Sequence, residues 1–66
     1  MAYNTEIAEK ILKTVTELQA NTKRTQKFRI IGYDQHDVQD TANELINFGK
    51  LNAQVAFKYD GVEITI

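Results

Sequence analysis

Residues 51–66 read LNAQVAFKYDGVEITI, in which two runs of alternating apolar and polar residues flank the dipeptide Asp60-Gly61. This dipeptide favours a two-residue β-hairpin turn, because Asp tolerates a left-handed backbone and Gly adopts one without steric cost. One face of the hairpin is then apolar, and the other carries an opposite-charge pair. The pattern predicts these facing pairs: Tyr59 with Val62, Lys58 with Glu63, Phe57 with Ile64, Ala56 with Thr65 and Val55 with Ile66.

Length and composition limit the class of protein. The chain has 66 residues, no Cys and eight basic against nine acidic residues, a net charge of -1. Without Cys it has neither disulfides nor a thiol nucleophile, and its balanced charge gives no general attraction to DNA or anionic membranes. The sequence has no apolar run long enough to span a bilayer and no signal-peptide pattern. We therefore expect one small domain, residues 1–66, in the cytoplasm.

Two amphipathic helices are predicted on either side of a polar loop. The second runs from about residue 35 to residue 48, with Asp34 as N-cap and Gly49 just past its end. The first covers about residues 5–20, with Asn4 as N-cap, and its apolar residues recur on one side: Ile7, Ala8, Ile11, Leu12, Val15 and Leu18.

A further strand is predicted at residues 28–33, FRIIGY, because β-branched and aromatic residues favour extended structure. The expected fold is α+β, in the order helix, strand, helix, strand, strand. Short strands tend to lie at edges, so we expect the strand order 1-2-3, the first strand parallel to the second, and both helices on one face. The open face would present Arg29, Ile31, Tyr33, Asn52, Gln54, Ala56, Lys58, Glu63 and Thr65.

An open sheet face with apolar and aromatic side chains is typical of a protein interface. Free edges on the first and third strands are an alternative, because an edge can recruit a strand from another chain. The sequence therefore predicts a small non-enzymatic interaction or regulatory protein that binds a protein partner, with a homodimer as one form. The residues expected to bind are Arg29, Ile31, Tyr33, Gln54 and Lys58.

The basic segment at residues 23–29 indicates a second function. Four cations in seven positions, near aromatic rings, are typical of groups that hold phosphates and stack on bases. The alternative prediction is a small nucleic-acid-binding regulator that uses Lys23, Arg24, Lys27 and Arg29.

Catalytic or metal chemistry has one candidate, His36, the only histidine of the chain. Three carboxylates lie near it in sequence, but helix capping and the helix dipole explain acidic residues in the opening turns. No Ser or Cys nucleophile is evident beside it, and the glycines are too scattered for a phosphate loop. We therefore expect no catalytic residues, no metal and no cofactor.

Overall fold

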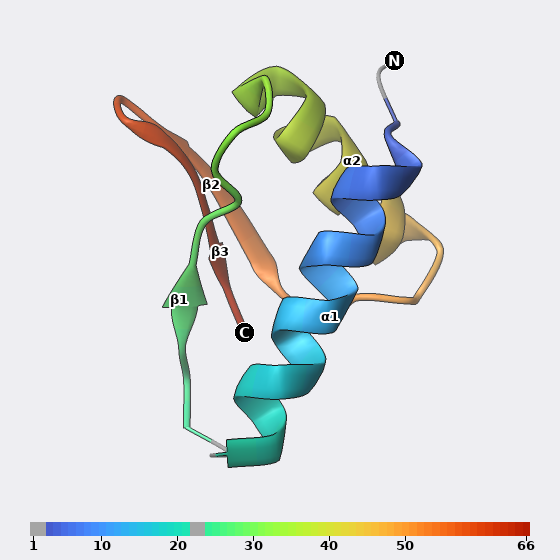
Figure 1. Ribbon diagram of the computed structural model, residues 1–66, viewed down its shortest axis with the longest axis vertical. Helices are drawn as coiled ribbons and strands as arrows, with labels where there is room; N and C mark the ends of the chain where they lie inside the picture. Colours follow the sequence, from blue (N-terminus) through green and yellow to red (C-terminus); the bar gives the residue numbers. More distant parts are fainter. Residues whose placement is uncertain (1–2, 22–23) are drawn as a thin grey trace.

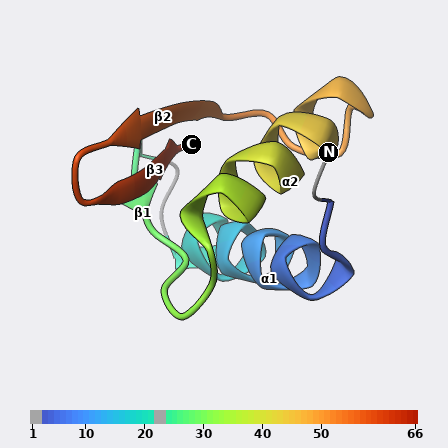
Figure 2. The same ribbon diagram turned by 90° about the horizontal axis from the view of Figure 1, so that it is seen from above.

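The computed structural model describes residues 3–21 and 24–66. In chain order the elements are α1 (Thr5–Asn21), β1 (Lys27–Phe28), α2 (Gln35–Asn47), β2 (Gln54–Lys58) and β3 (Gly61–Thr65) (Figure 1). α2 packs against β2 and β3, and α1 packs against α2 (Figure 2). The predicted α+β class is confirmed. Neither described helix has the length and apolar character needed to cross a membrane.

Both helices form where their periodicity predicts them, and their caps are the expected residues. The carboxylate of Asp34 accepts hydrogen bonds from two N–H groups of the first turn of α2, at 2.8 and 3.4 Å. The amide oxygen of Asn4 does the same for α1, at 2.8 and 3.2 Å. After α2, Gly49 has a φ of 76°, and the N–H of Lys50 returns to the carbonyl of Leu45 at 2.9 Å. This end of α2 is a Schellman motif.

The sheet has the order β1-β3-β2, with both strand pairs antiparallel. The predicted order 1-2-3 is therefore wrong, and β1 and β2 run parallel without being neighbours. The rule that short strands lie at edges does place β1 correctly, but β2 and β3 have five residues each, so length does not separate them. Burial explains why β3 is the central strand, because β3 carries the fully buried Val62 and Ile64, whereas β2 is mostly exposed.

The hairpin forms, but its register differs from the predicted one by two residues. Tyr59 and Asp60 make the turn, and among residues 3–21 and 24–66 only glycines have a positive φ. The expected left-handed Asp60 is therefore wrong, and within the hairpin only Gly61 takes a positive φ, 134°. A shift of two residues keeps every side chain on its predicted face, because side chains alternate with a period of two. The observed pairs are Lys58 with Gly61, Phe57 with Val62, Ala56 with Glu63, Val55 with Ile64 and Gln54 with Thr65.

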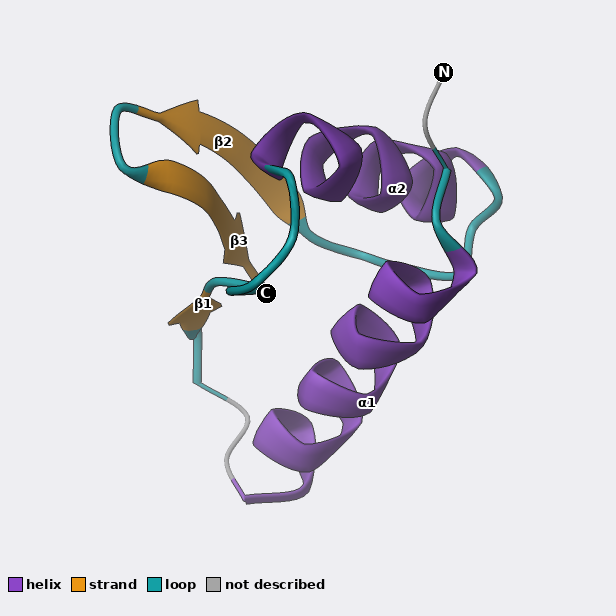
Figure 3. Cartoon of the chain, turned by 45° about the horizontal axis from the view of Figure 1, so that its top comes forward, coloured by secondary structure: helices purple, strands orange, loops and turns teal. Residues whose placement is uncertain are grey.

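β1 is much shorter than the predicted strand at residues 28–33. The Gln35 side chain replaces the backbone hydrogen bonds that the next residue pair of β1 and β3 would form. Continuing the β1–β3 register would set Ile30 opposite Val62. Instead, the Gln35 Oε1 atom accepts the N–H of Val62 at 3.0 Å, and Gln35 Nε2 donates to the carbonyls of Ile30 at 3.2 Å and Tyr33 at 2.9 Å. The Gln35 amide thus bridges the strands where β1 ends, and the loop continues from there to α2 (Figure 3).

The core lies between the two helices and the inner face of the sheet. The N–H of Asn4 also donates to the buried hydroxyl of Thr41 at 3.0 Å, which joins the start of α1 to α2. Phe57 lies on the predicted apolar face of the hairpin but is 45% exposed, because the observed register sets it close to the turn. The buried apolar residues are Ile7, Ala8, Ile11, Ile30, Val38, Ala42, Leu45, Leu51, Val62 and Ile64.

Replacing the bridging amide tests its structural role. We expect Gln35→Ala to lower the free energy of unfolding by about 1 to 3 kcal/mol, because the N–H of Val62 and the carbonyl of Ile30 lose their partner. Urea unfolding measures this change. The matched control is Gln39→Ala, also half-buried on α2, which should stay within about 0.5 kcal/mol of the wild type. Equal losses in the two variants would contradict the bridge.

Candidate interaction surface

The side of the sheet that faces away from the helices, called here the outer face, is polar. Its side chains come from all three strands and from the residue just past β1. At its centre lies Glu63, whose side chain is only 15% exposed although it stands on this open side. The outer face consists of Lys27, Arg29, Gln54, Ala56, Lys58, Glu63 and Thr65.

Ion pairs connect all four charged residues of the outer face. Glu63 lies 3.2 Å from Lys58, 3.6 Å from Lys27 and 3.6 Å from Arg29. Arg29 also contacts Asp60, in the hairpin turn, at 2.8 Å. The hydrogen bond from Lys58 lowers the pKa of Glu63, and the hydrogen bond from Arg29 lowers the pKa of Asp60. The predicted Lys58–Glu63 pair thus forms, although the two residues are diagonal neighbours rather than directly opposite.

Four of the five predicted partner-binding residues lie on or beside the outer face. Arg29, Gln54 and Lys58 belong to it. Ile31 is 85% exposed in the loop after β1. It lines a shallow hollow together with Lys27, Phe28, Arg29 and Glu63.

Tyr33 does not lie on the outer face, so its predicted position is wrong. It is half-buried and packs against the core, on the helix side of the sheet. Burial raises the pKa of its hydroxyl, and the neighbouring carboxylate of Glu6 on α1 adds to the increase. The prediction failed because β1 ends at Phe28, so strand alternation does not extend to residue 33.

The four cations of the alternative nucleic-acid prediction are only partly assembled. Lys23 lies outside the described residues. Arg24 is exposed in the loop before β1. Lys27 and Arg29 share the outer face, where both contact Glu63.

The free long side of β2, called here the β2 edge, is a second candidate surface. The strand order makes β1 and β2 the edges of the sheet, so the expected edge on the third strand is wrong. β1 has only two residues, whereas β2 has five, QVAFK. Edge strands are usually protected by charges, proline or bulges. β2 has a single charged residue, Lys58, at its end.

The backbone groups that β2 turns outward follow from its pairing. The N–H of Val62 points away from β2, since Gln35 accepts it on the β1 side. Facing residues of an antiparallel pair direct their backbone groups either toward each other or both away. Phe57 faces Val62, so the N–H and C=O of Phe57 point to the β2 edge. The same holds for Val55, two residues earlier.

Two aromatic residues flank the β2 edge near the turn. The ring of Phe57 lies 5.0 Å from that of His36 at the start of α2. Tyr59 is fully exposed in the turn, which lies away from both helices (Figures 1 and 2). The only histidine thus packs beside an aromatic ring, with an angle of 32° between the ring planes. The described residues contain no group of three His, Cys, Asp or Glu arranged to hold a metal ion.

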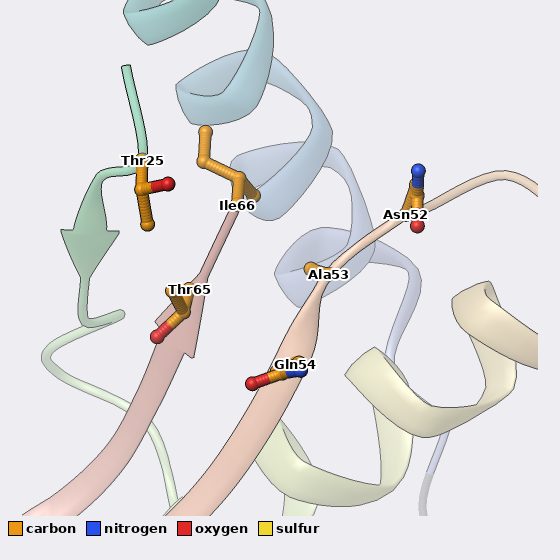
Figure 4. A pocket seen from close by; sticks show the side chains of 6 residues that line it. All are labelled: Thr25, Asn52, Ala53, Gln54, Thr65 and Ile66. Carbon is orange, nitrogen blue, oxygen red and sulfur yellow. The ribbon is translucent and has the colours of Figure 1, made fainter.

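An open hollow of about 340 Å³ lies where β3 ends beside the start of β2 (Figure 4). None of the side chains that line it is ionisable, so they provide hydroxyl and amide groups but no general acid or base. The lining residues are Thr25, Asn52, Ala53, Gln54, Thr65 and Ile66.

Comparisons of the chain with protein-family models, with characterised proteins and with solved structures find no match.

The charge network predicts a measurable pKa change. We expect Lys58→Gln to raise the pKa of Glu63 toward its ordinary value, because the carboxylate loses its shortest cationic contact. An NMR titration of the Glu63 side-chain carboxyl carbon measures this. Lys50→Gln, at an exposed lysine after α2, is the control and should leave that pKa unchanged. The same Glu63 pKa in the wild type and in Lys58→Gln would contradict the network.

The network also predicts how stability depends on pH. Folding lowers the pKa of both Glu63 and Asp60, so their ion pairs stabilise the fold above the unfolded carboxyl pKa of about 4. This stabilisation is lost as the pH falls through the lower folded-state pKa. We expect the urea midpoint to fall on acidification below about pH 4, and to fall less in Glu63→Gln. Parallel pH profiles for the two proteins would contradict this.

Proposed function

We propose that this protein is a non-enzymatic binding protein that adds an extended segment of a protein partner to the β2 edge. The observation that supports this most is the outward direction of the Val55 and Phe57 backbone groups on an edge strand that carries little protection. Strand addition is a common way for a small domain to bind a peptide segment.

The outer face supports the proposal less than the β2 edge does. Its cations contact Glu63 and Asp60, so a partner that covered it would have to desolvate or break those ion pairs. Ala56 is its only apolar side chain within the strands. A partner strand at the β2 edge leaves every one of these pairs in place.

The β2 edge supplies both affinity and selectivity. Val55 and Phe57 present two N–H donors and two C=O acceptors, and each hydrogen bond formed contributes about 0.5 to 1.5 kcal/mol net. The half-exposed ring of Phe57, beside His36, adds an apolar contact on the inner side of the sheet. The best partner segment is therefore extended, with an apolar residue opposite this ring and no positive charge beside Lys58.

Capture of the partner tests the proposal at the β2 edge. We expect Phe57→Lys to lose the proteins that the immobilised wild type retains from native cell extract, because a lysine removes the apolar contact and adds charge to the edge. Phe48→Lys is the matched control, since Phe48 is also an exposed aromatic residue, 59% exposed, but lies at the end of α2. The retained partner should also protect the amide protons of Val55 and Phe57 from exchange.

Two outcomes would contradict the proposal. Equal retention by Phe57→Lys and Phe48→Lys would exclude the β2 edge as the binding surface. Loss of binding over orders of magnitude between low and moderate salt would instead indicate phosphate contacts, and so the nucleic-acid alternative with Lys27 and Arg29.

A further inference from the structure

The β2 edge is complementary to a second copy of itself. When two β2 strands pair antiparallel, only residues whose backbone groups point outward form hydrogen bonds between the copies. These residues are Val55 and Phe57, so each must face Val55 or Phe57 of the other strand. Three registers satisfy this condition. Only the register with Val55 opposite the partner's Phe57 pairs all five residues of β2, and the other two pair three residues of each strand.

The side chains fit this fully paired register. Ala56 meets the partner's Ala56 on the two-fold axis, where facing side chains come closest and a methyl group leaves room. Lys58 lies opposite the partner's Gln54, so no like charges face each other, and its ammonium group already contacts Glu63 at 3.2 Å. On the inner side, Val55 would lie opposite the partner's Phe57, which is 45% exposed in the single chain.

We propose that two copies of this chain pair through their β2 edges in this register, forming one continuous sheet across a two-fold axis. The strand order is then β1-β3-β2 in one copy, followed by β2-β3-β1 in the other. Such an interface is isologous, because both copies contribute the same surface. Val55 of one copy faces Phe57 of the other, and Phe57 of the first faces Val55 of the second. This inference rests on the proposed function, because it uses the same edge and names a second copy as the partner.

The absence of Cys from the chain permits a cross-linking test of both the edge and the register. In the proposed dimer the two Ala56 Cα atoms form a non-hydrogen-bonded pair about 4.5 Å apart. A disulfide spans Cα atoms about 4.4 to 6.8 Å apart, so Ala56→Cys should cross-link in a glutathione redox buffer, oxidised glutathione taking the two electrons.

The matched control is Gln54→Cys, on the same strand, the same face and also exposed. In the proposed register the two residues 54 lie four positions apart along the strands, about 13 Å. We expect Ala56→Cys to form disulfide dimers at least about tenfold faster than Gln54→Cys. Equal rates would overturn the proposal, and so would faster cross-linking of Gln54→Cys. Matching urea midpoints for the two reduced variants establish that both are folded.

The wild-type protein supplies a second measurement that needs no substitution. Raising its concentration from about 10 µM to about 1 mM should increase its sedimentation coefficient, because an interface of one strand per copy is in the weak class. The amide protons of Val55 and Phe57 should become protected over the same range, and Phe57→Lys should abolish both changes. A monomer throughout this range overturns the dimer. Partner capture that still distinguishes Phe57→Lys from Phe48→Lys would then leave the proposed function standing.

Discussion

The side-chain amide of Gln35 joins the start of α2 and the loop after β1 to β3, whose Val62 lies 27 residues further along the chain. It accepts from the N–H of Val62 in β3 and donates to the carbonyls of Ile30 and Tyr33. It therefore satisfies backbone groups that would be costly to bury unpaired where β1 leaves the sheet. A Cβ atom at Gly61 would lie only 3.1 Å from Gln35 Oε1, and the φ of 134° at this position is one that other residues rarely adopt, so this arrangement favours glycine. The end of β1, the start of α2 and the hairpin turn are coupled through one amide group.

The charges of the outer face change what an open sheet can bind. Glu63 is largely covered by its three cationic neighbours, and Asp60 holds Arg29 from the turn. No described element covers this face, yet all four of its charged side chains already have partners within the chain. The apolar residues that would suit a face-on interface, Ile31 and Tyr33, lie beside it and behind it. Along the β2 edge, by contrast, backbone groups point outward, and a strand added there would break no ion pair.

The register of the hairpin determines the composition of the β2 edge. Because Tyr59 and Asp60 form the turn, β2 ends at Lys58, and Ala56 is the middle residue of the strand. The contact between Asp60 and Arg29 accompanies this register, in which Asp60 keeps a negative φ. Phe57 consequently lies close to the turn, where it is partly exposed next to His36. The position of the turn thus determines which side chains the edge presents.

Local sequence determined the two helices, their caps and the existence of the hairpin, since periodicity, capping and turn chemistry act over a few residues. It also placed Arg29, Gln54 and Lys58 on the open side, because alternation survives a shift of two residues. The sequence did not determine the strand order, the end of β1 or the position of Tyr33. These depend on contacts between residues distant in the chain, namely burial of Val62 and Ile64 in the central strand and the Gln35 bridge between strands. No local pattern marks Gln35 for that role, because only the folded chain brings its amide between Ile30 and Val62.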